Sequence, residues 1–499
     1  MTSAVSVREV RDYVGGVWTA PDAELERLPV HNPATGEQLA DVALGGADEV
    51  AAAVEAAQRA FPAWREVPPQ ERARYFFKLR DLLVAHREEL ARLITVDMGK
   101  TLDDSRGEVQ RGIDNVETAC GIPSLMMGYG LEDGAAAGID EEVVYQPLGV
   151  FAGISPFNFP FMIAFWFWPY AVACGNTFVL KPSEQDPLVQ QRTFELIDEV
   201  GFPPGVINLV NGGRAAVEAL LDHPLVQGVS FVGSTAVARA VYARASAAGK
   251  RVQAQGGAKN ALVVMPDADL DGSLANMIGS VYGAAGQRCL AGSLLLPVGR
   301  EARDASLEAI AGAARRMRVG DGLDPDVDMG PVVSAAAGER IRGAIAAGAK
   351  AGATLVLDGR DVKVPGHGGG YFVGPTVFDG VDPDMALARD EIFGPVLGVM
   401  PVASLDDAIA RVNASPYGNA ASIYTRDGGA AREFRYRVNA GNIGVNVGVA
   451  APVAYFPFSG MKQSFFGVLH GQGRDAVRFY TESKVVITRW PAPTGSSGG

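Results

Sequence analysis

The stretch Val229-Ser230-Phe231-Val232-Gly233-Ser234-Thr235 decides the fold, because a short apolar run passes through a glycine into a helical pattern. The run predicts a buried strand, and Thr235–Ala247 predicts the helix that follows it. Gly233 lets the backbone approach a ligand, and Ser234 or Thr235 can cap the helix, whose first N–H groups attract phosphate. The same residues also suit an ordinary strand-to-helix turn, and no Gly-x-Gly-x-x-Gly fingerprint stands here.

Strands and helices continue to alternate on both sides of this stretch. Further strands are predicted at Val143–Ile154, Thr177–Leu180, Gly205–Val210 and Ala261–Met265. Helices are predicted between them at Pro187–Val200 and Ala215–Leu221. Such alternation builds a parallel sheet covered on both faces, which binds ligands at the carboxyl ends of its strands. A second alternating region spans roughly residues 260–450, so we predict an α/β protein with two parallel-sheet domains.

The composition narrows the class of protein. The chain has 499 residues, 48% hydrophobic and 20% charged, which allows a large core and about three domains of ordinary size. Its net charge of −13 argues against a general nucleic-acid or membrane-surface binder. Residues 1–16 show no secretory signal, and the most apolar stretch, Phe159–Cys174, is short for a membrane span and contains two prolines. We therefore expect a buried core helix there and a cytoplasmic protein.

The cysteines and histidines exclude two kinds of site. Three cysteines far apart in the sequence, Cys120, Cys174 and Cys289, form no disulfide framework and fit a reducing compartment. The five histidines are scattered, without the spacing of metal ligands beside a cysteine or carboxylate cluster. We therefore predict no bound metal.

Cys289, in the run Gly286-Gln287-Arg288-Cys289, is the candidate nucleophile. Small residues before it let another group approach, and an adjacent guanidinium lowers the pKa of a thiol and favours the reactive thiolate. A lone cysteine is also a common small core residue. The polar, glycine-rich setting favours the nucleophile for Cys289, whereas the core interpretation suits the other two cysteines.

Three further runs each admit a functional and an ordinary interpretation. Lys181-Pro182-Ser183-Glu184 closes a predicted strand, where a lysine and a carboxylate suit ribose hydroxyls or simply a solvated turn. Asn158, among the aromatics and prolines of Pro156–Pro160, offers an amide to a developing oxyanion or holds a tight turn. Glu391–Val396 places a carboxylate and an aromatic before a Gly-Pro turn, which by itself is typical of a surface turn.

Taken together and in this order, the runs resemble the aldehyde dehydrogenase superfamily, from about Val30 to Trp490. The resemblance implies that Cys289 attacks the aldehyde carbon, that the Asn158 side chain and the Cys289 N–H hold the oxyanion, and that NAD takes the hydride. Lys181 and Glu184 would hold the adenosine ribose, Ser234 the pyrophosphate and Glu391 the nicotinamide ribose, and a free acidic residue at the ribose favours NAD over NADP. The full set of implied cofactor-binding residues is Ser155, Phe157, Lys181, Glu184, Gln185, Gly233, Ser234, Gly256 and Glu391.

One departure points to a branch of the superfamily. Hydrolytic members carry a glutamate as the base for the deacylating water, and the matching residue here is Gln255, which cannot accept a proton. Gly257–Asn260, Gly286–Cys289 and the late runs Phe456–Gly460 and Ser464–Gly467 resemble the methylmalonate-semialdehyde dehydrogenases, the CoA-acylating type. That likeness implies oxidation and decarboxylation of malonate or methylmalonate semialdehyde to acetyl-CoA or propionyl-CoA, with CoA as co-substrate.

The resemblance also assigns the substrate carboxylate and the assembly. Arg111 and Arg288 are candidates for bidentate capture of that carboxylate. Two positions differ from the usual pattern of the branch: Gln185 replaces an arginine, and Leu290-Ala291-Gly292 follows the nucleophile. The implied oligomer is a homotetramer, a dimer of dimers.

The predicted domains are discontinuous. Residues 1–120 and 143–256 form an NAD-binding domain and residues 257–450 a catalytic domain. Residues 121–142 and 470–490 form a small β oligomerisation element, and residues 491–499 a flexible tail. Two rival functions stay open: a hydrolytic NAD-dependent dehydrogenase for another aldehyde, and a non-catalytic relative that keeps only the fold. Gln255 argues against the first, and intact Cys289, Asn158 and Glu391 argue against the second.

Overall fold

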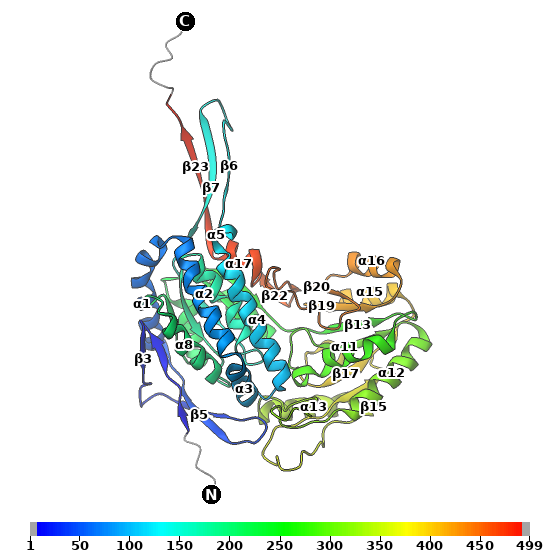
Figure 1. The fold of residues 1–499 in the computed structure, drawn as a ribbon. Helices are drawn as coiled ribbons and strands as arrows, with labels where there is room; N and C mark the ends of the chain where they lie inside the picture. The colour runs from blue at the N-terminus through cyan, green and yellow to red at the C-terminus, as the bar shows by residue number, and fades with distance from the viewer. Residues whose placement is uncertain (1–6, 492–499) are drawn as a thin grey trace.

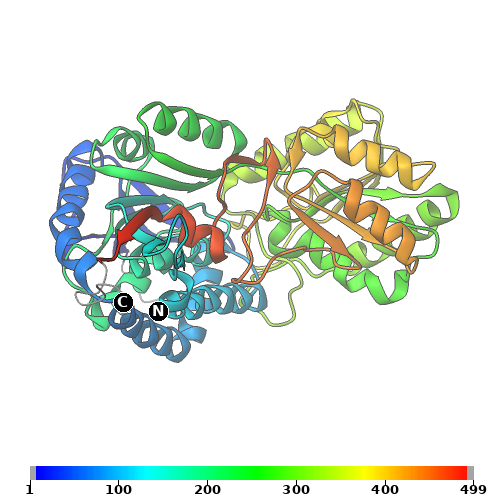
Figure 2. The same ribbon diagram turned by 90° about the horizontal axis from the view of Figure 1, so that it is seen from above.

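The computed structural model describes residues 7–491, arranged as two α/β lobes with a narrow three-stranded sheet projecting from the first (Figures 1 and 2). The first lobe is built on an eight-stranded sheet in the order β22-β12-β11-β8-β9-β10-β2-β3. Its central strands are parallel: β8 (Val150–Ile154), β9 (Thr177–Lys181), β10 (Ile207–Leu209), β11 (Val226–Val232) and β12 (Arg251–Gln255). The antiparallel edge strands are β22 (Phe465–Gly467), β2 (Asp12–Val14) and β3 (Val17–Thr19).

The strand order contains a switch point between β8 and β11. From β8 the chain builds β9 and β10 on one side, then crosses over and builds β11 and β12 on the other. Every residue of β8 and β9 is buried, which explains why these strands are continuously apolar rather than alternating. The crevice at the carboxyl ends of the strands on either side of a switch point is where such sheets bind ligands.

Helices cover both faces of this sheet. One face carries α1 (Ala47–Glu66), α9 (Arg214–Asp222) and α10 (Thr235–Ala247), which share one apolar core with the strands. The larger core on the other face includes α2 (Pro69–Ala85), α3 (Arg87–Met98), α4 (Leu102–Cys120), α5 (Ile122–Leu125), α6 (Met162–Phe165), α7 (Trp168–Ala173), α8 (Leu188–Val200) and α17 (Gly473–Phe479).

The second lobe has a seven-stranded sheet in the order β15-β16-β17-β14-β13-β19-β20, parallel except for β15. Its strands are β13 (Asn260–Val264), β14 (Gly292–Pro297), β15 (Thr354–Leu357), β16 (Thr376–Asp379), β17 (Val396–Val399), β19 (Ala420–Tyr424) and β20 (Asn442–Val445). Its helices are α11 (Leu270–Tyr282), α12 (Gly299–Arg316), α13 (Ala335–Lys350), α14 (Ala386–Arg389), α15 (Leu405–Ala414) and α16 (Gly428–Arg437), with a 3-10 turn at Gly283–Gly286.

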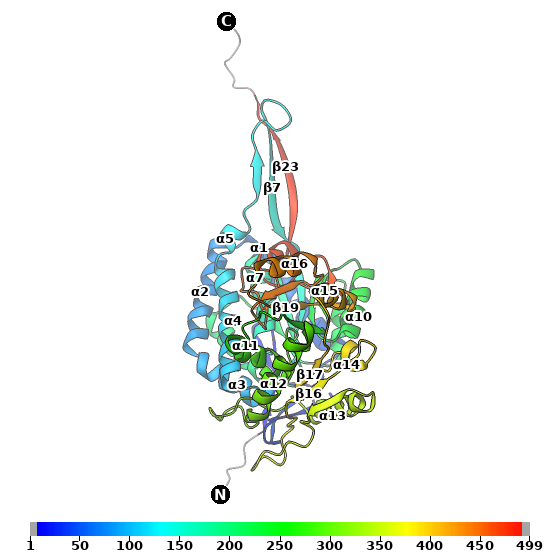
Figure 3. The ribbon, with the colours of Figure 1, turned by 90° about the vertical axis from the view of Figure 1, so that its right-hand side faces the viewer.

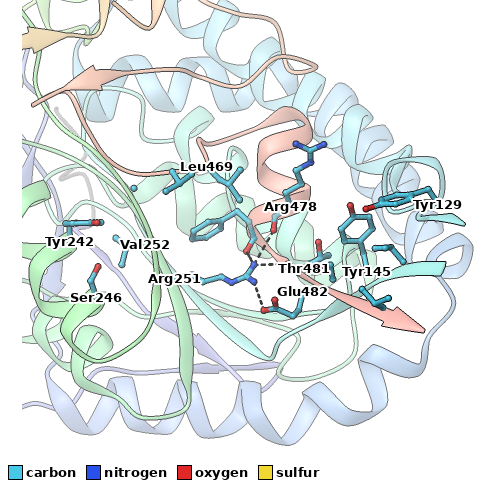
Figure 4. Close-up of a pocket in the computed structure, with 16 residues that line it drawn as sticks. Tyr129, Tyr145, Tyr242, Ser246, Arg251, Val252, Leu469, Arg478, Thr481 and Glu482 are labelled. Carbon is cyan, nitrogen blue, oxygen red and sulfur yellow. Dashed lines mark hydrogen bonds and ion pairs between the residues drawn. The ribbon is translucent and has the colours of Figure 1, made fainter. Parts of the chain in front are cut away.

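The projecting sheet contains β6 (Tyr129–Leu131), β7 (Ile139–Pro147) and β23 (Thr481–Arg489), all antiparallel (Figures 1 and 3). At its base the Arg251 guanidinium donates to the carbonyl oxygens of Phe479 (2.8 Å) and Thr481 (2.7 Å) and pairs with Glu482 (Figure 4). Two smaller sheets complete the fold: β1 (Arg8–Glu9), β4 (Arg27–His31) and β5 (Gln38–Ala43), and β18 (Tyr417–Gly418) with β21 (Met461–Lys462).

Two predicted elements differ from the structure. The predicted strand Val143–Ile154 is two strands of different sheets, separated at Gly149, whose φ of +145° no strand residue adopts readily. The boundary placed between residues 142 and 143 therefore falls inside β7. The predicted core helix Phe159–Cys174 is buried but divided into α6 and α7, because Pro169 cannot supply a helical N–H.

Two further points concern the predicted C-terminal tail and membrane-spanning helices. Of the predicted tail, residues 492–499 lie outside the described residues. Within residues 7–491 no helix combines the length and apolarity needed to cross a membrane.

Candidate active site

Four predicted cofactor-binding residues lie where parallel strands of the first sheet end. Ser155 follows β8, Lys181 ends β9, Gly233 follows β11 and Gly256 follows β12. Because neighbouring strands are parallel, these positions share one edge of the sheet, on both sides of the switch point. The Ser155 N–H donates to the Lys181 carbonyl oxygen at 3.1 Å, which joins two of them directly.

Lys181 and Glu184 form an ion pair at this edge. The ammonium of Lys181 donates to a Glu184 carboxylate oxygen at 2.7 Å, with the lysine buried and the glutamate about one-third exposed. The next residue, Gln185, donates its N–H to the Ser183 hydroxyl at 3.1 Å and is thereby held in the same turn. A donor and an acceptor so close together suit a pair of neighbouring hydroxyl groups.

The N-terminus of α10 is open to an anion. Ser234 occupies the cap position, yet its side chain does not cap the helix, and the Thr235 hydroxyl accepts from the Gly257 N–H instead, at 2.8 Å. The prediction that one of these hydroxyls caps α10 is therefore wrong, because Thr235 binds the chain that leaves β12. A helix start without a side-chain cap retains free N–H groups for a phosphate.

The residues at this edge fit NAD. The buried Ser155 hydroxyl has no hydrogen-bond partner within residues 7–491, and buried polar atoms of this kind are normally satisfied by a ligand or water. It lies across the switch point from the open start of α10. Together with the Lys181–Glu184 pair, these groups offer partners to a diphosphate and to a ribose.

Glu391 lies beside the connection from β12 to β13. Its carboxylate accepts from the Ala258 N–H at 2.9 Å, and burial raises the pKa of Glu391. Phe393 packs edge-on against Phe157, with ring centroids 5.8 Å apart, so the Glu391 segment of the second lobe meets the turn after β8 in the first. The two lobes therefore contact each other at this point.

Cys289 lies in the turn that precedes β14, half-buried, and two asparagines fix its backbone. Asn260 and Asn419 each donate a side-chain N–H to the Cys289 carbonyl oxygen at 2.8 Å. Burial, together with a smaller contribution from the nearby Glu391 carboxylate, raises the pKa of Cys289 to about 12. Both effects favour the protonated thiol over the thiolate.

The expectation that Arg288 lowers the pKa of Cys289 is corrected by the geometry. The Arg288 guanidinium pairs with Asp104 of helix α4 at 2.5 Å and donates to the Gly279 carbonyl oxygen of helix α11 at 3.2 Å. Its charge is thus largely neutralised by another side chain.

Asn158 reaches the same turn from the first lobe. Its side-chain amide donates to the Gln287 carbonyl oxygen at 2.9 Å, and the whole residue is buried. This hydrogen bond brings the Asn158 amide of the first lobe to the backbone of the turn that carries Cys289.

Gln255 and Arg111 complete the set of predicted residues. Gln255 is buried at the end of β12, and its amide donates to the Phe458 carbonyl oxygen at 3.2 Å. The Arg111 guanidinium makes one long hydrogen bond, 3.5 Å to the Pro452 carbonyl oxygen, and among the described residues it forms no ion pair. Burial lowers the pKa of Arg111, the nearby Asp114 carboxylate opposes that shift, and the charge of Arg288 adds to it.

The sequence profile of the aldehyde dehydrogenase family matches residues 18–486. The chain belongs to this family. Among its relatives, malonate-semialdehyde dehydrogenase 2 of Geobacillus kaustophilus is 49% identical over 97% of this chain and 99% of that protein. Malonate-semialdehyde dehydrogenase of Halalkalibacterium halodurans is 47% identical over 98% and 100%.

Solved structures of other family members agree closely with the fold of this aldehyde dehydrogenase. A protein of Sinorhizobium meliloti 1021 assigned as a methylmalonate-semialdehyde dehydrogenase, complexed with NAD, is 45% identical with a TM-score of 0.96, over 98% of this chain and 100% of that one. Methylmalonate-semialdehyde dehydrogenase of Oceanimonas doudoroffii is 46% identical with a TM-score of 0.95, over 97% and 99%.

The structure of this aldehyde dehydrogenase also adds residues that the sequence analysis missed. Asn419 and Asn260 bind the Cys289 carbonyl, and only Asn260 lies in a run that had been singled out. Lys259, in that same run, is buried, and burial lowers its pKa to about 8 although Glu391 opposes the shift. Nothing in the sequence distinguishes Asn419 from other asparagines. Within residues 7–491, no three His, Cys, Asp or Glu side chains are grouped to hold a metal ion.

Proposed function

We propose that this aldehyde dehydrogenase oxidises malonate or methylmalonate semialdehyde with NAD and delivers the acyl group to CoA, with loss of carbon dioxide. Full-length relatives named for these two substrates support the choice of substrate. The observation that carries the proposal is Gln255, a buried amide that cannot act as a base for water at the place where hydrolytic members have a carboxylate.

The proposed reaction begins when the Cys289 thiol loses its proton to solvent and the resulting thiolate attacks the aldehyde carbon. The oxygen gains negative charge, which the Asn158 amide and the Cys289 N–H stabilise. NAD supplies the hydride acceptor, and its positively charged nicotinamide also favours the thiolate. Loss of the aldehyde hydride leaves a thioester on Cys289, two electrons more oxidised than the aldehyde.

The substrate carboxylate explains the second half of the reaction. In the thioester the carbonyl is β to that carboxylate, so carbon dioxide can leave while the thioester accepts the electron pair as an enolate, which then takes up a proton. The CoA thiolate attacks the remaining acyl carbon and the Cys289 thiolate departs, which regenerates the enzyme. Arg111, which has no carboxylate partner among the described residues, is the residue we assign to the substrate carboxylate, with Arg288 nearby.

Product analysis with and without CoA tests this function. Malonate semialdehyde and NAD should give acetyl-CoA only when CoA is present, and turnover without CoA should fall at least tenfold, roughly the smallest change expected when no base activates water. Formation of a free acid without CoA at a similar rate would support the hydrolytic alternative. The Cys289→Ala variant should form no NADH with malonate semialdehyde or with methylmalonate semialdehyde.

The Gln255→Glu variant tests whether the absence of a carboxylate at position 255 explains slow hydrolysis of the thioester. A carboxylate there should raise CoA-independent turnover about tenfold or more above the parent, because it can accept a proton from water. The same change removes the N–H that binds the Phe458 carbonyl, so some loss of stability is expected. If CoA-independent turnover stays at the parent value in a folded Gln255→Glu protein, the identity of residue 255 does not decide the acyl acceptor.

We also propose that the protein is a homotetramer, a dimer of dimers, joined through its projecting sheet. That sheet leaves Tyr129, Leu131, Val485 and Ile487 more than 60% exposed. Apolar side chains gathered on an exposed sheet are typical of a surface that another chain covers.

A further inference from the structure

One face of helix α4 contacts both catalytic turns. Asp104, Glu108 and Arg111 are spaced by four and three residues, so they lie on the same side of the helix. The start of α4 lies against the second lobe, where the Leu102 N–H donates to the Gly322 carbonyl oxygen at 2.9 Å. The helix itself belongs to the core of the first lobe (Figure 1).

Asp104 binds both ends of the turn that precedes Cys289. Ala284, Ala285 and Gly286 have φ values of +49°, +53° and +70°, and two consecutive alanines in the left-handed region are unfavourable without support from their surroundings. One Asp104 oxygen accepts from the Ala284 N–H at 3.0 Å, and the other pairs with the Arg288 guanidinium. A single carboxylate therefore fixes this turn at its beginning and beside its nucleophile.

Glu108 binds the turn that carries Asn158. One of its oxygens accepts from the N–H groups of Phe161 (2.9 Å) and Met162 (3.0 Å), and the other pairs with Lys100 at 2.6 Å. The Lys100 ammonium also donates to the Asn158 carbonyl oxygen at 2.7 Å. The segment from Asn158 to Met162 is thus held at its start through the Asn158 carbonyl oxygen and at its end through the N–H groups of Phe161 and Met162.

The Lys100–Glu108 pair is fully buried, with no exposed side-chain surface on either residue. Removing two charges from water is unfavourable, and their mutual attraction compensates only when further hydrogen bonds satisfy both groups. Here those further bonds all go to the Asn158 turn. This arrangement indicates that the Lys100–Glu108 ion pair positions the Asn158 turn, in addition to any effect on the stability of the fold.

We propose that α4 aligns the two catalytic turns, with Asp104 as a positioning residue for Cys289 and Glu108, through Lys100, as a positioning residue for Asn158. The two carboxylates are one helical turn apart on a rigid element, so they fix the distance between nucleophile and amide donor across the two lobes. The inference rests on the proposed roles of Cys289 and Asn158, but not on the identity of the aldehyde or of the acyl acceptor.

Asp104 variants test the first half of the proposal by stopped-flow measurement of the first turnover of NADH, with propanal as the aldehyde. Asp104→Ala should lower the rate of this first turnover about 100-fold, the order expected when reacting groups lose alignment. Asp104→Asn keeps an acceptor for the Ala284 N–H and should recover about tenfold of that loss. The KM for NAD should stay within about twofold in both variants, which separates alignment from cofactor binding.

Asp103 gives the matched control, because it is the preceding residue of the same helix, 90% exposed and paired only with Arg106. Asp103→Ala should leave the first-turnover rate unchanged within about twofold. Asp104 has no positioning role if Asp104→Ala keeps the parent rate, or if Asn recovers nothing relative to Ala.

Glu108 is tested by a single variant and by a charge-balanced double variant. Glu108→Gln retains an acceptor for Phe161 and Met162 but leaves the buried Lys100 charge unpaired, which is strongly destabilising. Should it fail to fold, the charge-balanced double variant Lys100→Met with Glu108→Gln provides the measurement. The double variant should turn over propanal about tenfold or more slowly, because the Asn158 carbonyl has lost its cation. A folded Glu108→Gln protein should be slowed in the same direction, because the Lys100 ammonium has lost the carboxylate that holds it against the Asn158 carbonyl.

Exposed Glu117, also on α4, supplies the control Glu117→Gln, which should match the parent enzyme. A folded variant at position 108 with the parent first-turnover rate overturns the Glu108 assignment. Cys289→Ala and Asn158→Ala are measured in the same assay: if these retain the first turnover, the proposed function fails. If they lose it while the α4 variants do not, only the alignment proposal fails.

Discussion

Cys289, the proposed nucleophile, and the carboxylate of Glu391 lie close enough that the charge of one works against the ionisation of the other. Burial raises the pKa of Cys289 to about 12, and Glu391 is the largest charged contribution to that shift. Burial also raises the pKa of Glu391, whereas the hydrogen bond from the Ala258 N–H and the charges of Lys259 and Arg340 favour its ionised form.

We predict that Glu391→Gln increases the reactivity of the Cys289 thiol. Removing a negative charge lowers the pKa of Cys289, so more thiolate exists at any pH below that value, and alkylation by iodoacetamide at pH 9 should become about 3- to 10-fold faster. Asp390→Asn, an exposed neighbour, is the control and should change the rate little. An unchanged or slower alkylation of Glu391→Gln would contradict the assignment of Glu391 as the charge that acts on Cys289.

The two arginines assigned to the substrate carboxylate occupy different situations, which gives a second prediction. Arg111 is free of carboxylate partners among the described residues, whereas Arg288 is paired with Asp104. Arg111→Leu should raise the KM for malonate semialdehyde about 10- to 100-fold and the KM for propanal less than twofold, because only the first substrate loses a charged partner.

Arg288→Leu should instead lower kcat for both aldehydes, since it disturbs the Asp104 contact beside Cys289. Steady-state kinetics with the two aldehydes distinguishes these patterns. Equal effects of Arg111→Leu on both substrates would remove Arg111 from the carboxylate site.

At the scale of elements, the carboxyl ends of β8, β9, β11 and β12 and the start of α10 form the cofactor edge. The apolar strands at these positions could be predicted, because burial on both faces makes a parallel strand continuously hydrophobic. The strand β12 could not, since Gln253 inside it is polar; its buried side chain donates to the Ser230 hydroxyl at 2.7 Å from the neighbouring strand. When the polar side chains of a buried strand bind a neighbouring strand, the sequence of that strand lacks the continuous apolar run by which a buried strand is predicted.

The contacts that position the turns of Asn158 and Cys289 also could not be predicted from the sequence. The sequence singled out Asn158, Arg288 and Cys289, but the partners that position them lie far away along the chain. Asp104 is 184 residues from Arg288. Long-range pairings of this kind depend on the folded arrangement of α4 against both lobes, which hydrophobic periodicity alone does not specify.

The uncapped start of α10 gives a prediction in which one substitution should affect protein stability and NAD binding in different ways. In Ser234→Asp a carboxylate can accept from the free N–H groups of the helix, so the melting temperature should stay level or rise. The same negative charge opposes a diphosphate at that position, so the KM for NAD should rise about tenfold or more. Ser234→Thr, which keeps the hydroxyl, is the control. A tight NAD site in a folded Ser234→Asp protein would exclude the diphosphate from the start of α10.

At the scale of the whole molecule, the projecting sheet is the part that the protein's own core does not cover. Strand β23 pairs with β7 along its full length, from Thr481 opposite Pro147 to Arg489 opposite Ile139. Its backbone on the other side has no partner strand among the described residues, and Val485 (61% exposed) and Ile487 (65% exposed) lie on one face of it. Beside its base, Tyr129, Tyr145 and Tyr242 line a hollow that extends to helix α10 (Figure 4).

An exposed strand with an apolar face is a surface on which another chain can bury area, so the assembly should depend on that face. We predict that the double variant Val485→Asp with Ile487→Asp shifts the protein in analytical ultracentrifugation from a tetramer to dimers or monomers, because burying two carboxylates in an interface without partners is unfavourable by several kcal/mol. Lys484→Asp, on the opposite face of β23 and across from Val144, changes the charge by the same two units without altering that face and should sediment like the parent. Since Cys289 and its partners all lie within one chain, each variant should still reduce NAD with propanal at a rate within about threefold of the parent. A tetramer that survives the double variant would place the subunit contacts elsewhere, and a dissociated protein without activity would mean that neighbouring subunits support the crevice between the lobes.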